Sequence, residues 1–175
     1  MAQKTSPTLL SSCARASTAE ESRYRVNYPN SGPRSTRIFA LDASAADTIS
    51  KITEDPWQGA RFLTVTGDDV DPESADVNDL ILLAPDGTKA NLSAELNEAD
   101  VVVLISAEGQ NAGAAEMIAR EAFQRNIMTA GLALAFDQTS SRSDTVVNIL
   151  RPFASVLVVA KDHEFIPAML TALRA

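Results

Sequence analysis

Residues 100–135 read DVVVLISAEGQNAGAAEMIAREAFQRNIMTAGLALA, and this stretch decides the fold class. It opens on a continuous apolar run, passes two glycines and enters a segment with the 3.6-residue periodicity of a helix. A second apolar run follows at residues 127–135. A continuous apolar run suits a strand that is covered on both faces, so the stretch predicts a strand–helix–strand unit in a parallel sheet.

The same alternation of apolar runs and helical patterns extends from about residue 36 to the end of the sequence. We expect strands at residues 37–43, 60–67, 80–85, 100–107, 127–135 and 155–161. We expect helices at residues 44–55, 91–99, 112–125 and 144–153, and from about residue 165. This alternation predicts an α/β fold: a doubly wound, mostly parallel sheet in a Rossmann-like three-layer sandwich. The expected organisation is a flexible N-terminal extension at residues 1–34 and a single domain at residues 35–175.

Charge is distributed unevenly along the 175 residues, whose net charge is −8. Residues 1–37 hold six basic and two acidic residues, a net +4, so the remainder holds nine basic and twenty-one acidic residues, a net −12. An acidic body lacks the electrostatic footprint of a nucleic-acid-binding protein and repels anionic membranes. No apolar run reaches the roughly 20 residues that span a bilayer, and the single cysteine, Cys13, fits a reducing compartment. We therefore predict a cytoplasmic protein that binds neither nucleic acid nor membrane.

The loops that follow the strands are the places to look for a site, because ligands of doubly wound sheets bind at the carboxyl ends of the strands. The first such loop, LDASAAD at residues 41–47, has no glycine and so lacks the fingerprint that lets backbone N–H groups approach a pyrophosphate. Ser44 is the expected N-cap of the next helix. Asp42 is either a carboxylate favoured by the helix dipole or a catalytic or metal-binding carboxylate, and the first interpretation is the more common one.

The loop at residues 107–113 suits a ligand better, because Gly109 and Gly113 flank the start of a helix. With Asn111 as the cap, the free N–H groups of the first helical turn would form an anion site. The charge of Glu108 opposes a phosphate there unless a cation intervenes. The small residues at 112–115 predict equally well a helix that is packed tightly on the sheet, so the two interpretations stand side by side.

Two further loops carry polar side chains without a decisive pattern. The acidic loop begins like a calcium loop at Asp69, but Ser74 stands where glycine is required and Leu80 where glutamate is, so a solvated acidic loop is expected. Residues 136–143 carry hydroxyls and Arg142, which could hold a ribose or a phosphate or simply form a polar loop. His163 is the only histidine, which argues against a zinc site.

Taken together, these segments resemble the amino-terminal nucleotide-binding domain of the FtsZ/tubulin family, and FtsZ more than tubulin. RIFALDASAADTISKITEDPWQGARFLTVTGDD, at residues 37–69, is similar to the opening strand, phosphate loop, helix and second strand of that family. Residues 99–137 are similar to its "AD" strand, glycine-rich signature loop, "AA…IA" helix and following strand. RPFASVLVVAKD, at residues 151–162, resembles the next strand, so the resemblance covers about residues 36–165.

The resemblance implies a nucleotide-binding fold and a set of ligand-binding positions. The family's signature loop cradles phosphates, its first loop contributes to the same site, and a later loop contacts ribose. The positions that this implies are Gly109, Gln110, Asn111, Gly113, Ser44 and Arg142. The glycines of the first loop are replaced at residues 42–46, the signature loop keeps only two glycines, and the sequence ends before the family's central helix and catalytic loop. GTP hydrolysis is therefore not expected.

Three hypotheses for the function follow. The first is a divergent FtsZ-like domain that binds a small anionic or phosphate-bearing ligand, such as a nucleotide, without hydrolysis. The second is a ligand-free protein-interaction or regulatory module, with a protein partner or a second copy as its target. The third is a metal-dependent enzyme that uses Asp42, Asp68 or Asp69 together with Glu108, and no spacing signature supports it. The sequence specifies no cofactor and no catalytic residue.

Overall fold

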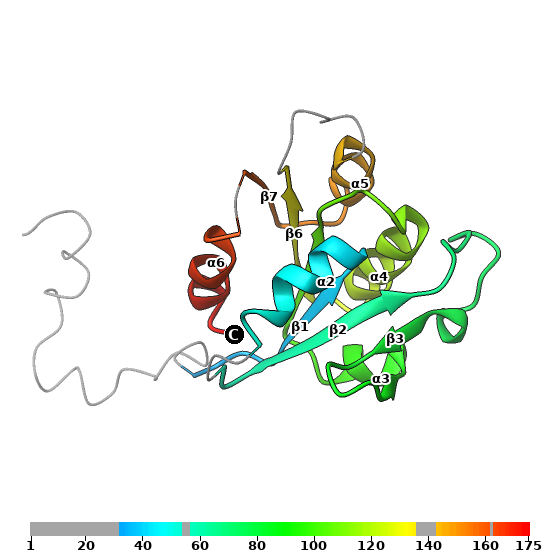
Figure 1. The fold of residues 1–175 in the computed structure, drawn as a ribbon. Coiled ribbons are helices and arrows are strands. Elements are labelled where there is room, and N and C mark those ends of the chain that lie inside the picture. The colour runs from blue at the N-terminus through cyan, green and yellow to red at the C-terminus, as the bar shows by residue number, and fades with distance from the viewer. Residues whose placement is uncertain (1–31, 54–56, 136–142, 162) are drawn as a thin grey trace, which may run out of the picture. The chain divides into compact units, whose positions relative to one another are not determined.

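The computed structural model describes residues 32–53, 57–135, 143–161 and 163–175. In these residues seven strands form one sheet, with helices packed on both of its faces (Figure 1). The strands are β1 (Thr36–Ala40), β2 (Ala60–Thr66), β3 (Ile81–Leu83), β4 (Lys89–Ala90), β5 (Val101–Ser106), β6 (Met128–Leu134) and β7 (Val156–Ala160). The helices are α2 (Ala43–Ser50), α3 (Leu92–Asn97), α4 (Ala112–Gln124), α5 (Ser143–Leu150) and α6 (Phe165–Leu173), with a short 3₁₀ helix, η2 (Val77–Asp79), before β3.

The strand order across the sheet is β4-β3-β2-β1-β5-β6-β7. β1, β2, β5, β6 and β7 run parallel, whereas β3 is antiparallel to β2 and β4 is antiparallel to β3. The chain builds outward from β1 to β4, then crosses to β5 and builds outward to β7. The topological switch point of the sheet therefore lies between β1 and β5.

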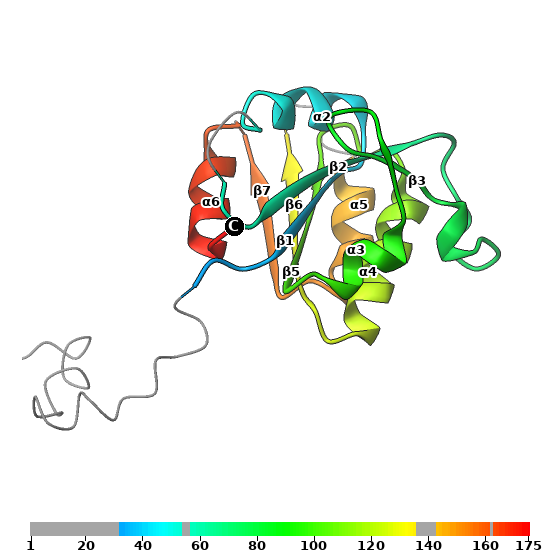
Figure 2. The ribbon, with the colours of Figure 1, turned by 90° about the horizontal axis from the view of Figure 1, so that it is seen from below.

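The helices divide between the two faces of the sheet (Figure 2). α2 and α6 cover one face, where Ile49 and Leu170 belong to one cluster of buried apolar residues. α3, α4 and α5 cover the other face, where Leu96, Ile118 and Leu150 belong to a second cluster. This arrangement confirms the predicted α/β fold with a Rossmann-like three-layer sandwich.

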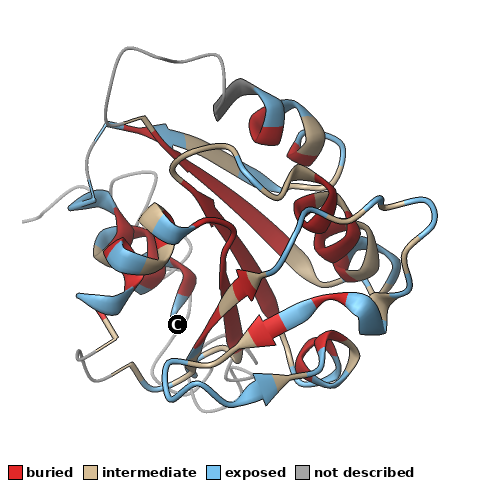
Figure 3. Cartoon of the chain, turned by 45° about the vertical axis from the view of Figure 1, so that its right-hand side comes forward, coloured by how far each residue is buried: buried red, intermediate tan, exposed pale blue. Residues whose placement is uncertain are grey.

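The centre of the sheet is formed by β1 and β5, and every residue of both strands is buried (Figure 3). Ile38 and Val103 contribute to the cluster beneath α2 and α6, while Phe39 and Leu104 contribute to the cluster beneath α3, α4 and α5. A strand that buries both rows of its side chains needs apolar residues at successive positions. The continuous apolar run that was expected to form a central strand therefore does so.

A buried ion pair joins β1 to its neighbours at the amino ends of the strands. The guanidinium Nε of Arg37 lies 2.7 Å from Glu95 Oε2, and both side chains are less than 10% exposed. Glu95 Oε1 also lies 3.0 Å from Nε of Arg61, and Arg37 donates to Ser35 and Glu98. Because Arg37 is on β1, Arg61 on β2 and Glu95 on α3, this network fixes the register between two strands and a helix.

The main differences from the predicted elements lie at their ends. The helix expected at residues 44–55 ends at Ser50, and residues 54–56 are outside the described part of the chain. β4 was not predicted, because a two-residue strand has no periodicity of its own. Either Asn91 or Ser93 suited the N-cap of α3 from the sequence, and the structure shows that it is Asn91, whose side chain accepts a hydrogen bond from the N–H of Ala94.

The compact unit formed by this sheet and its helices runs from Pro33 to Ala175. The predicted N-terminal extension at residues 1–34 falls almost entirely outside the described residues. Among the helices in the described ranges, none is both long enough and apolar enough to cross a membrane.

Candidate functional site

The crevice between the carboxyl ends of β1 and β5 is the place where this topology would bind a ligand. The two strands are paired up to Ala40 and Ile105, and the N–H of Leu41 still donates to the carbonyl of Ile105 at 2.9 Å. The loops that leave the strands here, at residues 41–42 and 107–111, lead directly into α2 and α4. The first residues of these two loops therefore lie against each other.

The side chain of Asp42 lies between these two loops and bonds to both sides of the crevice. Its side chain is buried, at 2% exposure, and Oδ1 accepts a 2.9 Å hydrogen bond from the N–H of Ala45 in the first turn of α2. Its other oxygen, Oδ2, accepts three hydrogen bonds of 2.9 Å, from the hydroxyl of Ser106 and from the N–H groups of Ala107 and Glu108. One carboxylate thus caps α2 and accepts from two backbone N–H groups of the neighbouring loop.

The predicted N-cap of α2 is therefore corrected from Ser44 to Asp42. Both residue types are good caps, but Asp42 is the residue with extended backbone angles directly before the helix, whereas Ser44 already lies inside it. The Ser44 hydroxyl instead donates to the carboxylate of Glu108. Gln110 donates to the other oxygen of Glu108 at 2.6 Å, so Ser44, Glu108 and Gln110 form a second hydrogen-bonded group beside that of Asp42.

The loop before α4 has the backbone turns that its glycine and asparagine suggest. Gly109 has φ 71° and donates its N–H to the Ser106 hydroxyl at 3.0 Å. Asn111 is left-handed at φ 52°, and its side chain makes no capping bond to α4, which corrects the predicted role of this side chain as a cap. Its amide instead donates to the carbonyl of Leu41 at 2.6 Å and ties the two loops together.

The capping acceptor of α4 comes from a loop far away in the sequence. Asp69, in the loop after β2, accepts hydrogen bonds on Oδ1 from the N–H groups of Gly113 at 3.0 Å and of Ala114 at 3.3 Å. The same loop crosses so close to the helix that a Cβ atom at position 113 would overlap the carbonyl oxygen of Val70. Close approach of two backbones thus explains the glycine at 113 without a ligand.

The loops that follow β1, β2 and β5 are strongly acidic. The loops at residues 41–44, 67–80 and 107–111 hold eight carboxylates and no lysine or arginine. They are Asp42, Asp68, Asp69, Asp71, Glu73, Asp76, Asp79 and Glu108. The N–H of Glu73 and the hydroxyl of Ser74 hold the pKa of Asp71 below its ordinary value, so that this side chain keeps its charge. A phosphate would therefore meet a negative electrostatic potential, which repels it.

The structure thus brings together four of the six predicted ligand positions and their neighbours. Ser44, Gly109, Gln110 and Asn111 surround Asp42 and Glu108, while Gly113 lies one step away beneath the Asp69 loop. Arg142 lies outside the described residues. Among the residues that are described, no group of three or more His, Cys, Asp or Glu side chains is arranged to hold a metal ion.

The hydrogen-bonding roles of two residues, Ser106 and Asp69, were not predicted from the sequence, although Asp69 was considered as a metal-binding carboxylate. Ser106 ends the central strand and donates to Asp42, but a serine at a strand end carries no specific signal. Asp69 caps a helix that begins 43 residues later, so its role depends on the tertiary structure alone. Local rules for caps consider only residues next to the helix.

No model of a known protein family matches the sequence, and no curated protein matches it. The resemblance to the FtsZ/tubulin family therefore stays a prediction, and the function has to be argued from the geometry of the crevice.

Proposed function

We propose that this domain is a ligand-free protein-interaction or regulatory module, built on a nucleotide-binding type of fold whose crevice is closed by the chain's own carboxylates. The observation that carries this proposal is the buried carboxylate of Asp42. It accepts four hydrogen bonds: one from the first turn of α2, one from the end of β5 and two from the loop that leads to α4.

An anion site at the end of a parallel strand depends on backbone N–H groups that have no partner within the protein. Here the N–H groups of Ala107 and Glu108 donate to Asp42, and those of Gly113 and Ala114 donate to Asp69. A dissolved phosphate would have to displace a carboxylate that is covalently attached to the same chain. Displacement would also leave that carboxylate buried without its donors, which is costly.

The competing hypothesis is a small anionic ligand, bound without hydrolysis at Gly109, Gln110, Asn111 and Gly113. The same crevice would have to open for this, with Glu108 moving away from Ser44 and Gln110. A metal-dependent activity has less support, because the carboxylate of Asp42 already accepts one hydrogen bond on Oδ1 and three on Oδ2.

A titration separates the two hypotheses. We expect that GTP, GDP, ATP and NAD, each with Mg²⁺, produce no heat in isothermal titration and no change in the melting temperature of the intact protein. A ligand at 100 times its dissociation constant would add about 2.7 kcal/mol to the free energy of unfolding, which is readily measured. A melting shift of that size with any of these ligands would refute the closed crevice.

A matched pair of variants sharpens this test. Asp42→Ala frees the donors of the crevice, so inorganic phosphate should raise its melting temperature more than sodium chloride of equal ionic strength does. Asp47→Ala removes an exposed carboxylate from the same helix and should show no such difference. An equal response of the two variants would mean that Asp42 does not stand in the place of an anion.

A further inference from the structure

The two edges of the sheet are protected to very different degrees. β4, at one edge, has only two residues, and one of them is the exposed Lys89. Short edge strands and lysine side chains prevent pairing with other chains. β7, at the other edge, has five residues of sequence VLVVA with neither charge nor proline, and its Val156 and Val159 are 39% and 58% exposed. β7 therefore lacks the devices that protect β4.

The outer side of β7 presents hydrogen-bonding groups of the backbone. The N–H of Ser155 donates to the carbonyl of Thr129 at 2.8 Å, just before β7 pairs with β6. At the other end of the strand the carbonyl of Ala160 accepts from the N–H of Ala135 at 2.8 Å. Hydrogen-bonding groups alternate in direction along a strand, so those of Val156 and Val158 face β6 and those of Leu157 and Val159 point away from it. Among the strands in the described residues, β6 is the sole neighbour of β7.

Exposed apolar side chains gather around this edge. Five large apolar side chains of the described residues are exposed: Ile81, Phe123, Val156, Val159 and Phe165. Two of them lie on β7, and Phe165 begins the helix that follows it. Phe123 packs edge to face on Phe153, just before β7, with ring centroids 6.1 Å apart. Clustered exposed apolar groups mark interaction surfaces.

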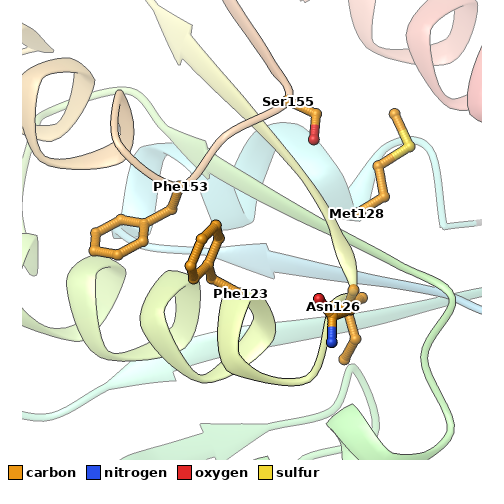
Figure 4. Close-up of a pocket in the computed structure, with 6 residues that line it drawn as sticks. Phe123, Asn126, Met128, Phe153 and Ser155 are labelled. Atoms are coloured by element: carbon orange, nitrogen blue, oxygen red, sulfur yellow. The ribbon is translucent and has the colours of Figure 1, made fainter.

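A hollow lies beside the start of β7, between the end of α4 and the segment that leads into the strand (Figure 4). Its volume is about 340 Å³, and its walls include the paired rings of Phe123 and Phe153 together with Met128 and Ser155. This volume is at the small end of the range for binding pockets, so it suits one or two apolar side chains rather than a large ligand.

We propose that β7 pairs in antiparallel fashion with β7 of a second copy of this chain, giving a two-fold symmetric dimer with one continuous sheet. In such a pair the segment before β7 in one copy lies beside the segment after β7 in the other. Phe165, at the start of α6 in each copy, then comes to the end of β7 in the other copy at which Ser155 and the aromatic hollow lie. Arg151 and Glu164, seven residues before and six residues after Val158, bring opposite charges to the same place.

Charge favours a second copy over a foreign segment. From Thr145 to Ala160 the sequence has one charged residue, Arg151, so joining two chains of net charge −8 by this edge brings no carboxylates of the strand together. The strand is also its own complement, since valines pair well with valines across neighbouring strands. The inference names the partner of the interaction module proposed above and rests on that proposed function for its biological meaning.

The test is the mass of the intact protein in solution, by sedimentation velocity up to about 100 µM, the range in which weak self-association is visible. We expect a dimer of two 18.6 kDa chains. Val159→Pro removes an outward N–H without breaking the pairing with β6, and Val159→Lys adds a charge at the same exposed position. Each should weaken the dimer at least about tenfold, because every substitution occurs twice in a two-fold interface.

Ile81→Lys is the matched control, because Ile81 is also apolar and exposed but lies on β3. It should leave the dimer intact, and circular dichroism should show that all three variants are folded. Three results would overturn the β7 interface. They are a monomeric mass at every concentration, a complex that contains another protein but no second copy of this chain, and a dimer that Ile81→Lys weakens as much as the β7 variants do. These outcomes are independent of the ligand titration, whose positive result would instead refute the closed crevice.

Discussion

A buried carboxylate destabilises a protein unless its oxygens are well supplied with donors. Asp42 satisfies this condition with one backbone donor on Oδ1 and three donors on Oδ2. The donors come from α2 and from the end of β5, so a single side chain links the two loops of the switch point. Its removal affects both loops at once.

We expect Asp42→Ala to lower the free energy of unfolding by about 2–4 kcal/mol, through loss of a helix cap and burial of unsatisfied donors. Urea unfolding followed by circular dichroism measures this. Asp47→Ala, an exposed change on the same helix, should stay within about 0.5 kcal/mol of the original protein. Equal effects of the two substitutions would contradict the central role of Asp42.

The role of Asp42 could be predicted from the sequence in part. An aspartate at the end of a strand and before a helix was expected to interact with the helix N-terminus, and it does. The choice of Ser44 as the cap was wrong because two good capping residues stand two positions apart and local rules rank them alike. The three donors on Oδ2 lie 64 to 66 residues away, where no local pattern reaches.

Between elements, Glu95 joins α3 to both β1 and β2. We expect Glu95→Ala to destabilise the protein by about 3–5 kcal/mol, because it leaves the buried guanidinium of Arg37 with no buried partner. Glu98 contacts the same arginine from a side chain that is 78% exposed, so Glu98→Ala should cost less than about 1 kcal/mol. Thermal unfolding of the two variants provides the comparison, and a cost for Glu98→Ala that matched Glu95→Ala would refute it.

The loop after β2 acts on α4 through Asp69. We expect Asp69→Ala to destabilise the protein by about 1 kcal/mol and to speed hydrogen exchange at the amides of Gly113 and Ala114, because the cap of the helix is lost. Asp68→Ala, at an exposed neighbour, should leave these amides protected. Unchanged exchange in the Asp69 variant would show that the cap contributes nothing.

Long apolar or periodic segments were predicted well at the scale of elements. β5 and α4 lie within a residue of their predicted bounds, because each has a strong pattern of its own. β4 was missed, because its two residues are ordered only by pairing with β3. The order of the strands, and with it the position of β7 at an edge, depends on long-range pairing that a single sequence does not display.

For the whole molecule, the uneven charge is the property that the sequence revealed most directly. The loops at residues 41–44, 67–80 and 107–111 hold eight carboxylates and no lysine or arginine, so these side chains repel one another at low ionic strength. We expect the melting temperature to rise by about 1–4 °C between about 10 mM and about 150 mM NaCl, as the screening length falls from about 30 Å to about 8 Å.

Neutralising two of these side chains provides the control. Asp68→Asn together with Glu73→Gln should reduce the salt dependence, since both positions are exposed and their removal weakens the repulsion. A melting temperature that fell with added salt would show that attractive ion pairs, such as those of Glu95, dominate instead.

The fold class follows from the sequence, whereas the closing of the crevice by Asp42 and Asp69 does not.

The central position of β1 has a consequence during synthesis. β1 emerges from the ribosome first but lies between β2 and β5, and forty residues separate the end of β2 at Thr66 from the end of β5 at Ser106. At 5–20 residues per second, about 2–8 s pass in which β1 has one open side and Asp42 lacks its partners from β5. The nascent chain therefore exposes a strand that is fully buried in the folded protein until β5 has been made, and this interval is when a chaperone would have most to bind.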